Sequence, residues 1–239
     1  MDVYKTNSIK DLIKGNSYVG RGIILGKSQD GKNAVSAYFI MGRSQNSRNR
    51  VFSYEDGVLY TKPFDVSKVE DPSLIIYAAV REYENKLIVT NGDQTDTIFE
   101  GLKQGKCFTK SLKSREFEPD APNLTPRISG MITFCDKDFS YKMSILKSAD
   151  KDGTACNRYT FDYSALCGLG HFIHTYVCDG NPIPTFQGEP ERTIIPNDVD
   201  QFTNEIWDNL DNDNKISLFV RYTNLETGEK QDRIINKNK

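Results

Sequence analysis

The pattern that most constrains this chain is a series of short turn signals between β-rich runs in its first ninety residues. The runs lie in three pairs, at 19–25 and 34–41, at 50–54 and 58–61, and at 74–83 and 86–90. Asp30-Gly31 and Asp56-Gly57 lie within the first two pairs, and Asp-Gly in this position is a strong signal for a β-hairpin. Glu84-Asn85 separates the third pair. Successive hairpins place neighbouring strands antiparallel, so the sequence predicts antiparallel sheet.

Other patterns predict helices that cover such sheets. Residues 74–80 are almost wholly apolar, which is typical of a strand covered on both faces in a layered domain. Amphipathic helices are predicted at 95–104 and 198–210, where apolar side chains recur at helical spacing. Further strands are predicted at 127–134, 141–146, 158–161, 171–177, 216–222 and 232–235. This combination predicts an α+β domain of stacked layers.

The composition narrows the class of protein. The net charge of −2 gives no global attraction to nucleic acid, which usually needs a strongly basic domain. No apolar run approaches the length of a membrane-spanning helix, and the N-terminus has no hydrophobic signal region. We therefore expect a soluble, cytoplasmic protein with no nucleic-acid or membrane partner. The five cysteines are an odd number without a CxxC pair, so reduced thiols are expected and a structural zinc site is not.

No repeat or low-complexity linker divides the chain. We expect a single domain at 18–239, preceded by a short N-terminal extension at 1–17. The sequence leaves the oligomeric state open, and a homo-oligomer is compatible with it.

The segment 42–50 is the best candidate for an anion site. It contains three arginines, two asparagines and two serines directly after a predicted strand. Arginine forks bind phosphate oxygens more directionally than lysine does, and in a mildly acidic protein such a cluster is distinctive. The alternative, equally weighted, is a solvated loop whose arginines pair with surface carboxylates.

Two further loops contain groups that could bind a ligand. The segment 90–97 links a strand to a helix, and its Asn-Gly turn and Asp/Thr cluster are explained mostly by helix capping. The segment 116–130 brings carboxylates near an arginine and the start of a strand. A carboxylate beside apolar walls can serve as a general acid or base, although an exposed acidic turn is the more common case.

The only two histidines, His171 and His174, lie in one run that leads into a Gly/Pro/Asn-rich loop at 179–190. In a strand these positions face opposite sides, so the two imidazoles are not expected to share a metal ion. A packed, hydrogen-bonded histidine is the commoner alternative to a catalytic one. The sequence contains no GxSxG, HExxH, P-loop or GxGxxG motif, so hydrolase triads, zincins and classical nucleotide folds lack support.

Five segments, taken in order, resemble a known family. They are Tyr18-Val19-Gly20-Arg21, Ala37-Tyr38 with 42–48, Thr90 to Asp96, Asn123 to Ile128, and Gly170-His171-Phe172-Ile173. Their order and spacing resemble the archaeal-type IMP cyclohydrolase family, from about Tyr18 to Pro190. The tail beyond Pro190 and the N-terminal extension depart from the compact pattern of that family.

The resemblance implies both a fold and a reaction. The fold is a four-layer αββα sandwich like that of the N-terminal-nucleophile hydrolases, in agreement with the α+β pattern. The reaction closes the purine ring of 5-formamidoimidazole-4-carboxamide ribonucleotide to give IMP and water, in de novo purine biosynthesis. The implied partner is a small purine ribonucleotide, and neither a cofactor nor a metal is expected. The substrate's own carboxamide nitrogen attacks, so the reaction needs no protein nucleophile, and correct positioning supplies much of the rate.

Arginines are the expected cations of this site. Arg43 and Arg48 are expected to hold the 5′-phosphate or to polarise the formyl oxygen. Arg21 or Arg50 is the alternative cation for these roles. Phosphate capture and stabilisation of a developing oxyanion use the same donors, so the sequence does not divide these roles.

Tyr77 and Glu118 complete the expected catalytic set with Arg48. The Tyr77 hydroxyl is a candidate donor to the formyl oxygen, because a buried hydroxyl needs a partner. Glu118 is the candidate proton carrier, with Asp120 as the alternative. The residues expected to bind substrate are Arg21, Arg43, Asn91, Asp93, Arg127 and, at the edge of the cleft, His171.

Two other functions remain open at this point. One is a non-catalytic purine-nucleotide-binding protein that keeps the arginines without the chemistry. The other is an N-terminal-nucleophile amidohydrolase that acts on a related amide. Because about sixteen residues follow Met1 before Tyr18, such an enzyme would need cleavage of the chain to present a nucleophile.

Overall fold

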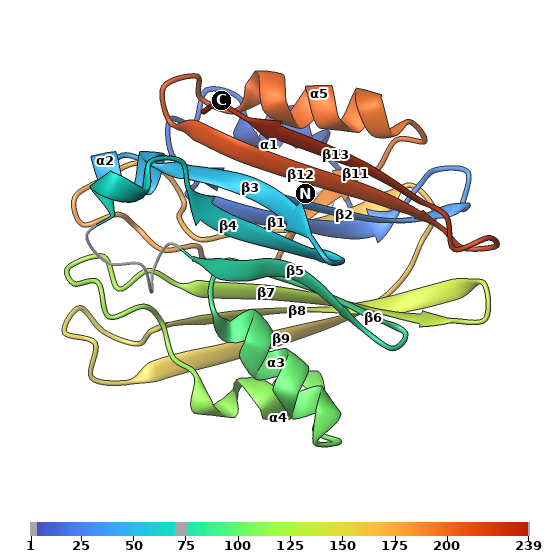
Figure 1. Ribbon diagram of the computed structural model, residues 1–239, viewed down its shortest axis with the longest axis horizontal. Helices are drawn as coiled ribbons and strands as arrows, with labels where there is room; N and C mark the ends of the chain where they lie inside the picture. Colours follow the sequence, from blue (N-terminus) through green and yellow to red (C-terminus); the bar gives the residue numbers. More distant parts are fainter. Residues whose placement is uncertain (1–3, 70–75, 239) are drawn as a thin grey trace.

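Two antiparallel sheets face each other in the computed structural model, which describes residues 4–69 and 76–238 (Figure 1). In spatial order, the upper sheet contains β11 (Glu191–Ile194), β10 (Leu169–His174), β1 (Arg21–Lys27), β2 (Asn33–Met41), β12 (Lys215–Asn224) and β13 (Lys230–Asn236). The lower sheet contains β3 (Arg50–Glu55), β4 (Val58–Pro63), β5 (Tyr77–Tyr83), β6 (Lys86–Thr90), β7 (Arg127–Cys135), β8 (Asp138–Ser148) and β9 (Cys156–Ser164). All of these neighbouring strands pair antiparallel, as the hairpin signals predict.

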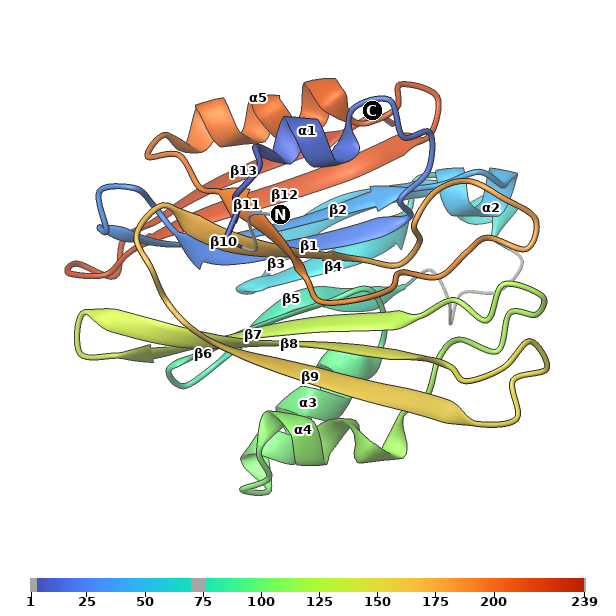
Figure 2. The same ribbon diagram turned by 180° about the vertical axis from the view of Figure 1, so that it is seen from behind.

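Helices cover the outer face of each sheet, which gives four layers (Figures 1 and 2). Above the upper sheet lie α5 (Val199–Asn209) and α1 (Ile9–Ile13), and below the lower sheet lie α3 (Gln94–Lys103) and α4 (Phe108–Ser111). One apolar core fills the space between the sheets, and a smaller core lies beneath each helical layer. The α+β sandwich of antiparallel sheets expected from the sequence is confirmed.

Several local features differ from the sequence-based expectation. Residues 9–13, within the expected N-terminal extension, form α1, and its two isoleucines are fully buried against α5. The short edge strand β11 was not predicted. It has only four paired residues, of which one is fully buried, so it shows no alternating apolar pattern in the sequence. Of the run expected to form a strand at 74–83, residues 74 and 75 lie outside the described part of the chain.

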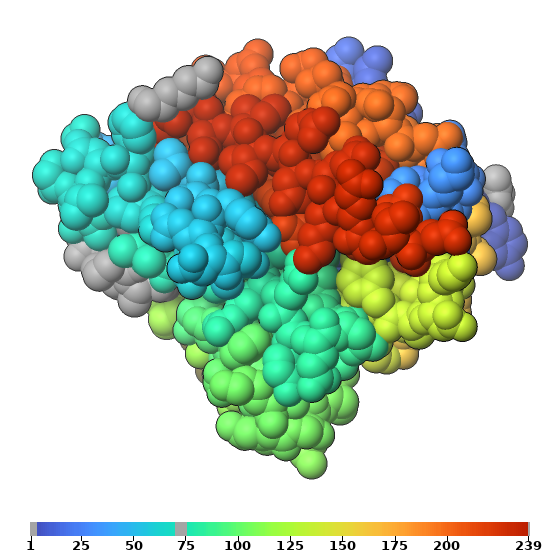
Figure 3. Space-filling model, turned by 45° about the vertical axis from the view of Figure 1, so that its right-hand side comes forward, coloured from blue at the N-terminus to red at the C-terminus, as the bar shows by residue number. Residues whose placement is uncertain are grey.

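The edge of the lower sheet closes onto the edge of the upper one. β3 lies beside β12 and β13, and Figure 3 shows the surface of the β3–β4 hairpin, in light blue, next to the red C-terminal strand. Asn236 of β13 bonds both backbone groups of Phe52 in β3, at 2.8 and 3.0 Å. The sandwich is therefore closed along this side.

A buried arginine ties the two sheets together at this closed side. Arg221 of β12 is 1% exposed and donates to Glu82 of β5 at 2.6 Å. Its other nitrogens donate to Asp232 of β13 at 2.6 and 2.7 Å and to the Tyr54 hydroxyl of β3 at 2.9 Å. One guanidinium thus holds strands of both sheets.

Arg221→Ala is expected to lower the free energy of unfolding by about 3 kcal/mol, because it removes the buried guanidinium and its hydrogen bonds to Glu82, Asp232 and Tyr54. The matched control is Arg233→Ala, which removes the exposed ion pair with Asp200. Exposed pairs contribute about 0–1 kcal/mol. Urea unfolding of the two variants measures the contrast, and equal losses would contradict it.

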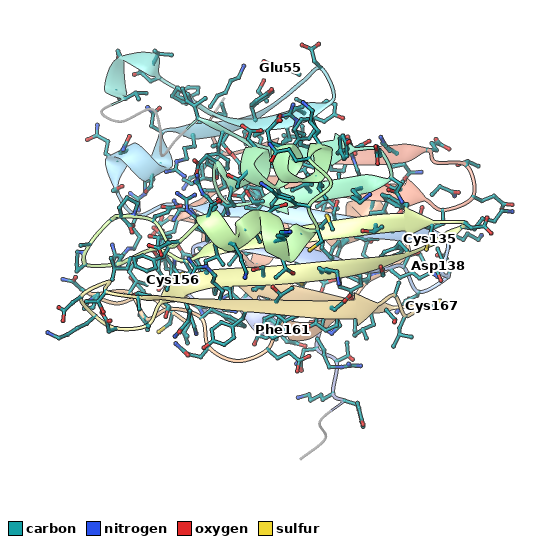
Figure 4. The ribbon with its side chains drawn as sticks, turned by 90° about the horizontal axis from the view of Figure 1, so that it is seen from below. Glu55, Cys135, Asp138, Cys156, Phe161 and Cys167 are labelled. Atoms are coloured by element: carbon teal, nitrogen blue, oxygen red, sulfur yellow. The ribbon has the colours of Figure 1, made fainter. Side chains whose placement is uncertain are left out.

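The five cysteines are all unpaired. Figure 4 shows Cys156, at the start of β9, at one end of the molecule, and Cys135 and Cys167 towards the other end. The expectation of free thiols is thus confirmed.

Candidate functional site

A polar cavity of about 210 Å³ opens at the end of the sandwich where β1, β3 and β7 begin. Four segments line it: 18–21 before and at the start of β1, 43–50 around α2 (Gln45–Arg48), the loop 118–125, and 176–183. These segments overlap three of the five sequence blocks that carry the family resemblance, at 18–21, 42–48 and 123–128. The cavity is therefore the candidate site.

The backbone before β1 places Arg21 in this cavity. Gly20 has a φ of +78°, and a Cβ there would lie 2.1 Å from the Thr175 hydroxyl. This close approach lets the backbone N–H of Arg21 donate to the same hydroxyl at 3.1 Å. Arg21 begins β1, in which Ile23 and Leu25 belong to the core between the sheets. By strand alternation, the Arg21 side chain faces the space between the sheets.

Arg21 and Arg50 are buried arginines with unused donors. Arg21 is 7% exposed and Arg50 is 4% exposed. Nε of Arg21, and Nε and one Nη of Arg50, are buried without a hydrogen-bond partner. Burial and the neighbouring charge of Arg21 lower the pKa of Arg50 from its ordinary value. Two adjacent buried cations with free donors are the arrangement that an anionic ligand would satisfy.

Glu118 supplies the opposing charge. It is 7% exposed, and burial raises its pKa although Arg21 and Arg127 act in the other direction. Burial opposes the charge of Arg21 as well, but the Glu118 carboxylate and nearby tyrosines outweigh this effect and raise the pKa of Arg21 overall. The negative charge of Asp120 raises the pKa of Glu118 further. Glu118 is thus a buried carboxyl group whose pKa is raised above its ordinary value, which makes it the candidate proton carrier of the cavity.

Two buried tyrosine hydroxyls lie near Arg50, but neither tyrosine is among the lining residues of the cavity. The Tyr77 hydroxyl of β5 is 2.8 Å from the Tyr38 hydroxyl of β2 and is buried between the sheets. Both tyrosines act electrostatically on Arg50. Burial raises the pKa of Tyr38 well above its ordinary value, so that hydroxyl stays neutral. The hydrogen-bond partner expected for the buried Tyr77 hydroxyl is therefore Tyr38.

The loop at 42–50 divides its arginines between different tasks. Arg43 lines the cavity, lies over the Tyr18 ring at 5.1 Å, and is ion-paired to Asp179. Arg48 is not among the lining residues: it donates to the Gly42 carbonyl at 3.1 Å and to Asn214 at 2.9 Å. Arg50, expected only as a reserve, is the arginine of this loop with buried free donors. The guanidiniums that meet in the cavity are therefore those of Arg21, Arg43 and Arg50.

Asn91, Asp93 and Arg127 form a bracing network next to the site. The Asn91 side chain donates to the Pro126 carbonyl and accepts from the backbone N–H of Ile128, both at 2.9 Å, at the start of β7. Arg127 donates to Asp93 at 2.7 Å, and none of the three lines the cavity. These contacts hold the start of α3 against the start of β7.

His171 is not a lining residue of the cavity. It lies opposite Leu25 of β1, which is four residues after Arg21. Its Nδ1 is 2.6 Å from the Tyr141 hydroxyl, and its ring stacks on Tyr163 with centroids 3.6 Å apart. Burial, with a smaller contribution from Arg192, lowers the pKa of His171 to about 4. The imidazole is thus a neutral, packed group between the sheets.

This pKa predicts a pH dependence of stability. An unfolded histidine binds a proton near pH 6.5, whereas folded His171 does so only near pH 4. Its contribution is therefore full above pH 6.5 and is lost as the pH falls from there towards 4. Between pH 7 and pH 4.5, wild-type protein should lose about 2 kcal/mol more unfolding free energy than His171→Gln. Urea unfolding at both pH values checks this, and parallel losses in the two proteins would contradict it.

Eight lining residues were not named as site residues from the sequence: Tyr18, Ser44, Asn46, Ser47, Asn123, Thr125, Tyr176 and Ile183. Tyr18 and Thr125 lie within the segments that carry the family resemblance, so that signal was available. Tyr176 lies beyond them, in the run that follows the histidines.

A larger cavity of about 400 Å³ lies at the opposite end of the sandwich. Its charged residues include Glu82 and Lys230, which pair with each other at 2.7 Å. It contains none of the residues with unused buried donors. The smaller cavity is therefore the better candidate for chemistry.

Residues 4–69 and 76–238 contain no group of three His, Cys, Asp or Glu side chains placed to hold a metal ion. Within the same residues, no helix has both the length and the apolar character needed to cross a membrane.

Comparison with known proteins points to one family. The family model described as IMP cyclohydrolase-like protein matches residues 18–229. An IMP cyclohydrolase of Methanopyrus kandleri is 33% identical over 116 residues, which cover 47% of this chain and 57% of that protein. One of Methanococcus maripaludis is 33% identical over 128 residues, covering 52% and 61%. One of Methanococcus aeolicus is 27% identical over 173 residues, covering 67% and 75%. The first two alignments thus span little more than half the length of those relatives.

Proposed function

Since the chain belongs to the IMP cyclohydrolase-like protein family, we propose that it closes the purine ring of 5-formamidoimidazole-4-carboxamide ribonucleotide to give IMP and water. The observation that carries this proposal is the pair of buried arginines, Arg21 and Arg50, with free donors beside a buried carboxyl, Glu118. The relatives named IMP cyclohydrolase support the same reaction. De novo purine biosynthesis in the cytoplasm is the setting that belongs to this proposal.

The arginines are proposed to neutralise the charge of the substrate and of the reaction. Arg43, which is partly exposed, is suited to the 5′-phosphate at the mouth of the cavity. Arg21 and Arg50, which are buried, are suited to an oxygen that gains negative charge as the formyl carbon becomes tetrahedral. Donors fixed in a water-poor site stabilise such an oxygen strongly, because they do not have to reorient during the reaction.

Glu118 is proposed to carry protons between the reacting atoms. The carboxamide nitrogen attacks the formyl carbon, and one of its protons must reach the formyl oxygen. The resulting hydroxyl then leaves as water with the proton of the former formamide nitrogen, so that nothing else is consumed. A carboxyl with a raised pKa holds a proton more readily and can pass it on, and Glu118 is the buried carboxyl of this cavity.

The other expected site residues have supporting parts in this proposal. The Tyr77 hydroxyl, held by Tyr38, can donate to the formyl oxygen. Asn91, Asp93 and Arg127 hold the loops that frame the cavity, and orientation of the base or sugar by them stays a prediction. Roles for Arg48 in catalysis and for His171 in binding also stay predictions.

The test is turnover by the purified, EDTA-treated protein. The formamido ribonucleotide is added, and IMP is followed by absorbance and chromatography. IMP formation that scales with protein supports the proposal. Tight nucleotide binding without IMP formation would instead identify a nucleotide-binding protein. Release of formate, with the ring still open, would identify an amidohydrolase.

A further inference from the structure

Tyr176 is a cavity-lining residue whose hydroxyl is held by a chain of hydrogen bonds. It is 1% exposed, and its hydroxyl lies 2.5 Å from the Thr125 hydroxyl. Thr125 in turn contacts Asp120 twice: its backbone N–H donates to one carboxylate oxygen at 2.6 Å, and its hydroxyl donates to the other oxygen. All three residues line the cavity. The catalytic steps proposed above do not use this chain.

The position of Tyr176 is fixed by its neighbours. The Tyr176 ring stacks on Tyr18, with centroids 5.7 Å apart, and its carbonyl accepts a hydrogen bond from Nδ1 of His174 at 2.6 Å. A glycine, Gly20, passes directly under the ring, since a Cβ there would lie 2.6 Å from it. The tyrosine therefore has little freedom to turn its hydroxyl elsewhere.

The hydrogen bonds from Tyr176 through Thr125 to Asp120 all point in one direction. A carboxylate can only accept hydrogen bonds, so the Thr125 hydroxyl uses its single proton in the hydrogen bond that it donates to Asp120. The Thr125 oxygen is then an acceptor, and the proton between the two hydroxyls must come from Tyr176. The Tyr176 oxygen keeps lone pairs but has no proton left to offer. Burial raises the pKa of Tyr176, which keeps the hydroxyl neutral and this order intact at neutral pH.

We propose that Tyr176 binds the nucleotide by accepting a hydrogen bond from one of its N–H or O–H groups, and that Asp120 and Thr125 are positioning residues that fix this orientation. The inference rests on the proposed function for the identity of the nucleotide. It also assigns Asp120 a task other than proton transfer, because both of its oxygens are engaged by Thr125. The donor on the ligand is either a ribose hydroxyl or the N–H of the base.

The test measures binding of IMP, which separates ligand contacts from turnover. Tyr176→Phe should weaken IMP binding about tenfold, because the ligand donor loses its partner in a buried site. The matched control is Tyr222→Phe, which removes a buried hydroxyl bound to the Pro196 carbonyl, outside the cavity. With 2′-deoxy-IMP as the ligand, disappearance of the Tyr176→Phe effect identifies the ribose hydroxyl, and persistence identifies another donor. Either result supports a hydrogen bond between Tyr176 and the ligand, and the Asp120→Asn variant tests the direction of that bond.

The roles of Asp120 and Thr125 are tested by variants that reverse or remove these hydrogen bonds. Asp120→Asn keeps the shape but lets an amide donate to Thr125, which turns the Tyr176 proton towards the ligand. This variant should bind IMP about tenfold more weakly. A purely electrostatic role for Asp120 predicts the opposite, because removal of a negative charge favours an anionic ligand. Thr125→Val should weaken binding likewise, and Thr125→Ser should restore it.

Two results would overturn the inference in distinguishable ways. If wild-type protein converts the substrate and Tyr176→Phe binds IMP as tightly as Tyr222→Phe does, only the role of Tyr176 is wrong. If wild-type protein neither binds IMP nor forms it, the proposed function is wrong and this inference falls with it. Thermal unfolding of each variant establishes that it is folded before binding is measured.

Discussion

Glu118→Gln is expected to lower the turnover of the formamido ribonucleotide by about 10²–10⁴-fold, the usual contribution of a general acid or base. Glutamine keeps the size of the side chain and a hydrogen-bonding oxygen, but it cannot exchange a proton. Binding of IMP should change far less, because the contacts proposed to bind the nucleotide come from Arg43 and Tyr176. The two effects together distinguish a proton carrier from a binding residue.

The matched control for this variant is Glu116→Gln. Glu116 lies two residues earlier in the same loop and pairs with Arg158 on the surface, with 62% of its side chain exposed. Its replacement should leave turnover within about twofold of wild type, since an exposed ion pair contributes little. Full turnover by a folded Glu118→Gln protein would remove the assignment, and Tyr77 would then be the next proton donor to test.

The raised pKa of Glu118 adds a stability signature with a definite sign. A carboxyl whose pKa is higher in the folded state stabilises the fold fully below its unfolded pKa, and this contribution is lost as the pH rises through the folded value. The unfolding free energy of Glu118→Gln relative to wild type should therefore increase with pH across that interval. Denaturant unfolding from pH 4 to pH 8 measures it, and a difference that stays flat would contradict the raised pKa. A variant that gains relative stability while it loses turnover shows that the carboxyl is kept for function.

The sheet architecture could be predicted because its signals are local. Asp-Gly turns and alternating apolar runs act over a few residues, and the hairpins they predict are present. β11 and α1 could not be predicted in this way, because each is short and depends on distant partners for its burial. α1 is a five-residue helix that packs on α5, which lies almost two hundred residues later in the chain.

The site was predicted less completely, for a physical reason that the arginine loop illustrates. The sequence identifies 42–50 as rich in arginine, but Arg48 and Arg50 are only two residues apart. The single turn of α2 directs Arg48 towards Asn214, whereas Arg50 begins β3 and is buried. Which guanidinium enters the cavity is decided by tertiary packing. The contact between Thr125 and Tyr176 spans 51 residues of sequence and is equally invisible to local patterns.

Replacement of the buried arginines by lysine is expected to have an effect nearly as large as loss of Glu118. Arg21→Lys and Arg50→Lys should each lower kcat/KM by about 10²–10³-fold, the usual cost of removing one donor to a developing oxyanion. Lysine keeps the charge but is shorter in reach and lacks the planar fork, so the free Nε and Nη donors are lost. Arg48→Lys is the matched control, and it should stay within about threefold of wild type because Arg48 bonds Gly42 and Asn214 instead. A larger loss for Arg48→Lys than for Arg21→Lys would restore Arg48 as the catalytic cation.

The same pair of cations predicts a trade between activity and stability. Burial and the charge of Arg21 both lower the pKa of Arg50, which means that the folded protein disfavours a second cation at this point. Replacement of a buried, incompletely paired charge by an apolar side chain of similar volume is often stabilising. Arg50→Met should therefore raise the free energy of unfolding by about 1 kcal/mol while turnover is lost. Equilibrium unfolding and the IMP assay on one preparation measure both quantities. A destabilised Arg50→Met protein would show that Arg50 holds the fold together. A stable and inactive one would show that the two arginines are kept side by side to bind an anion.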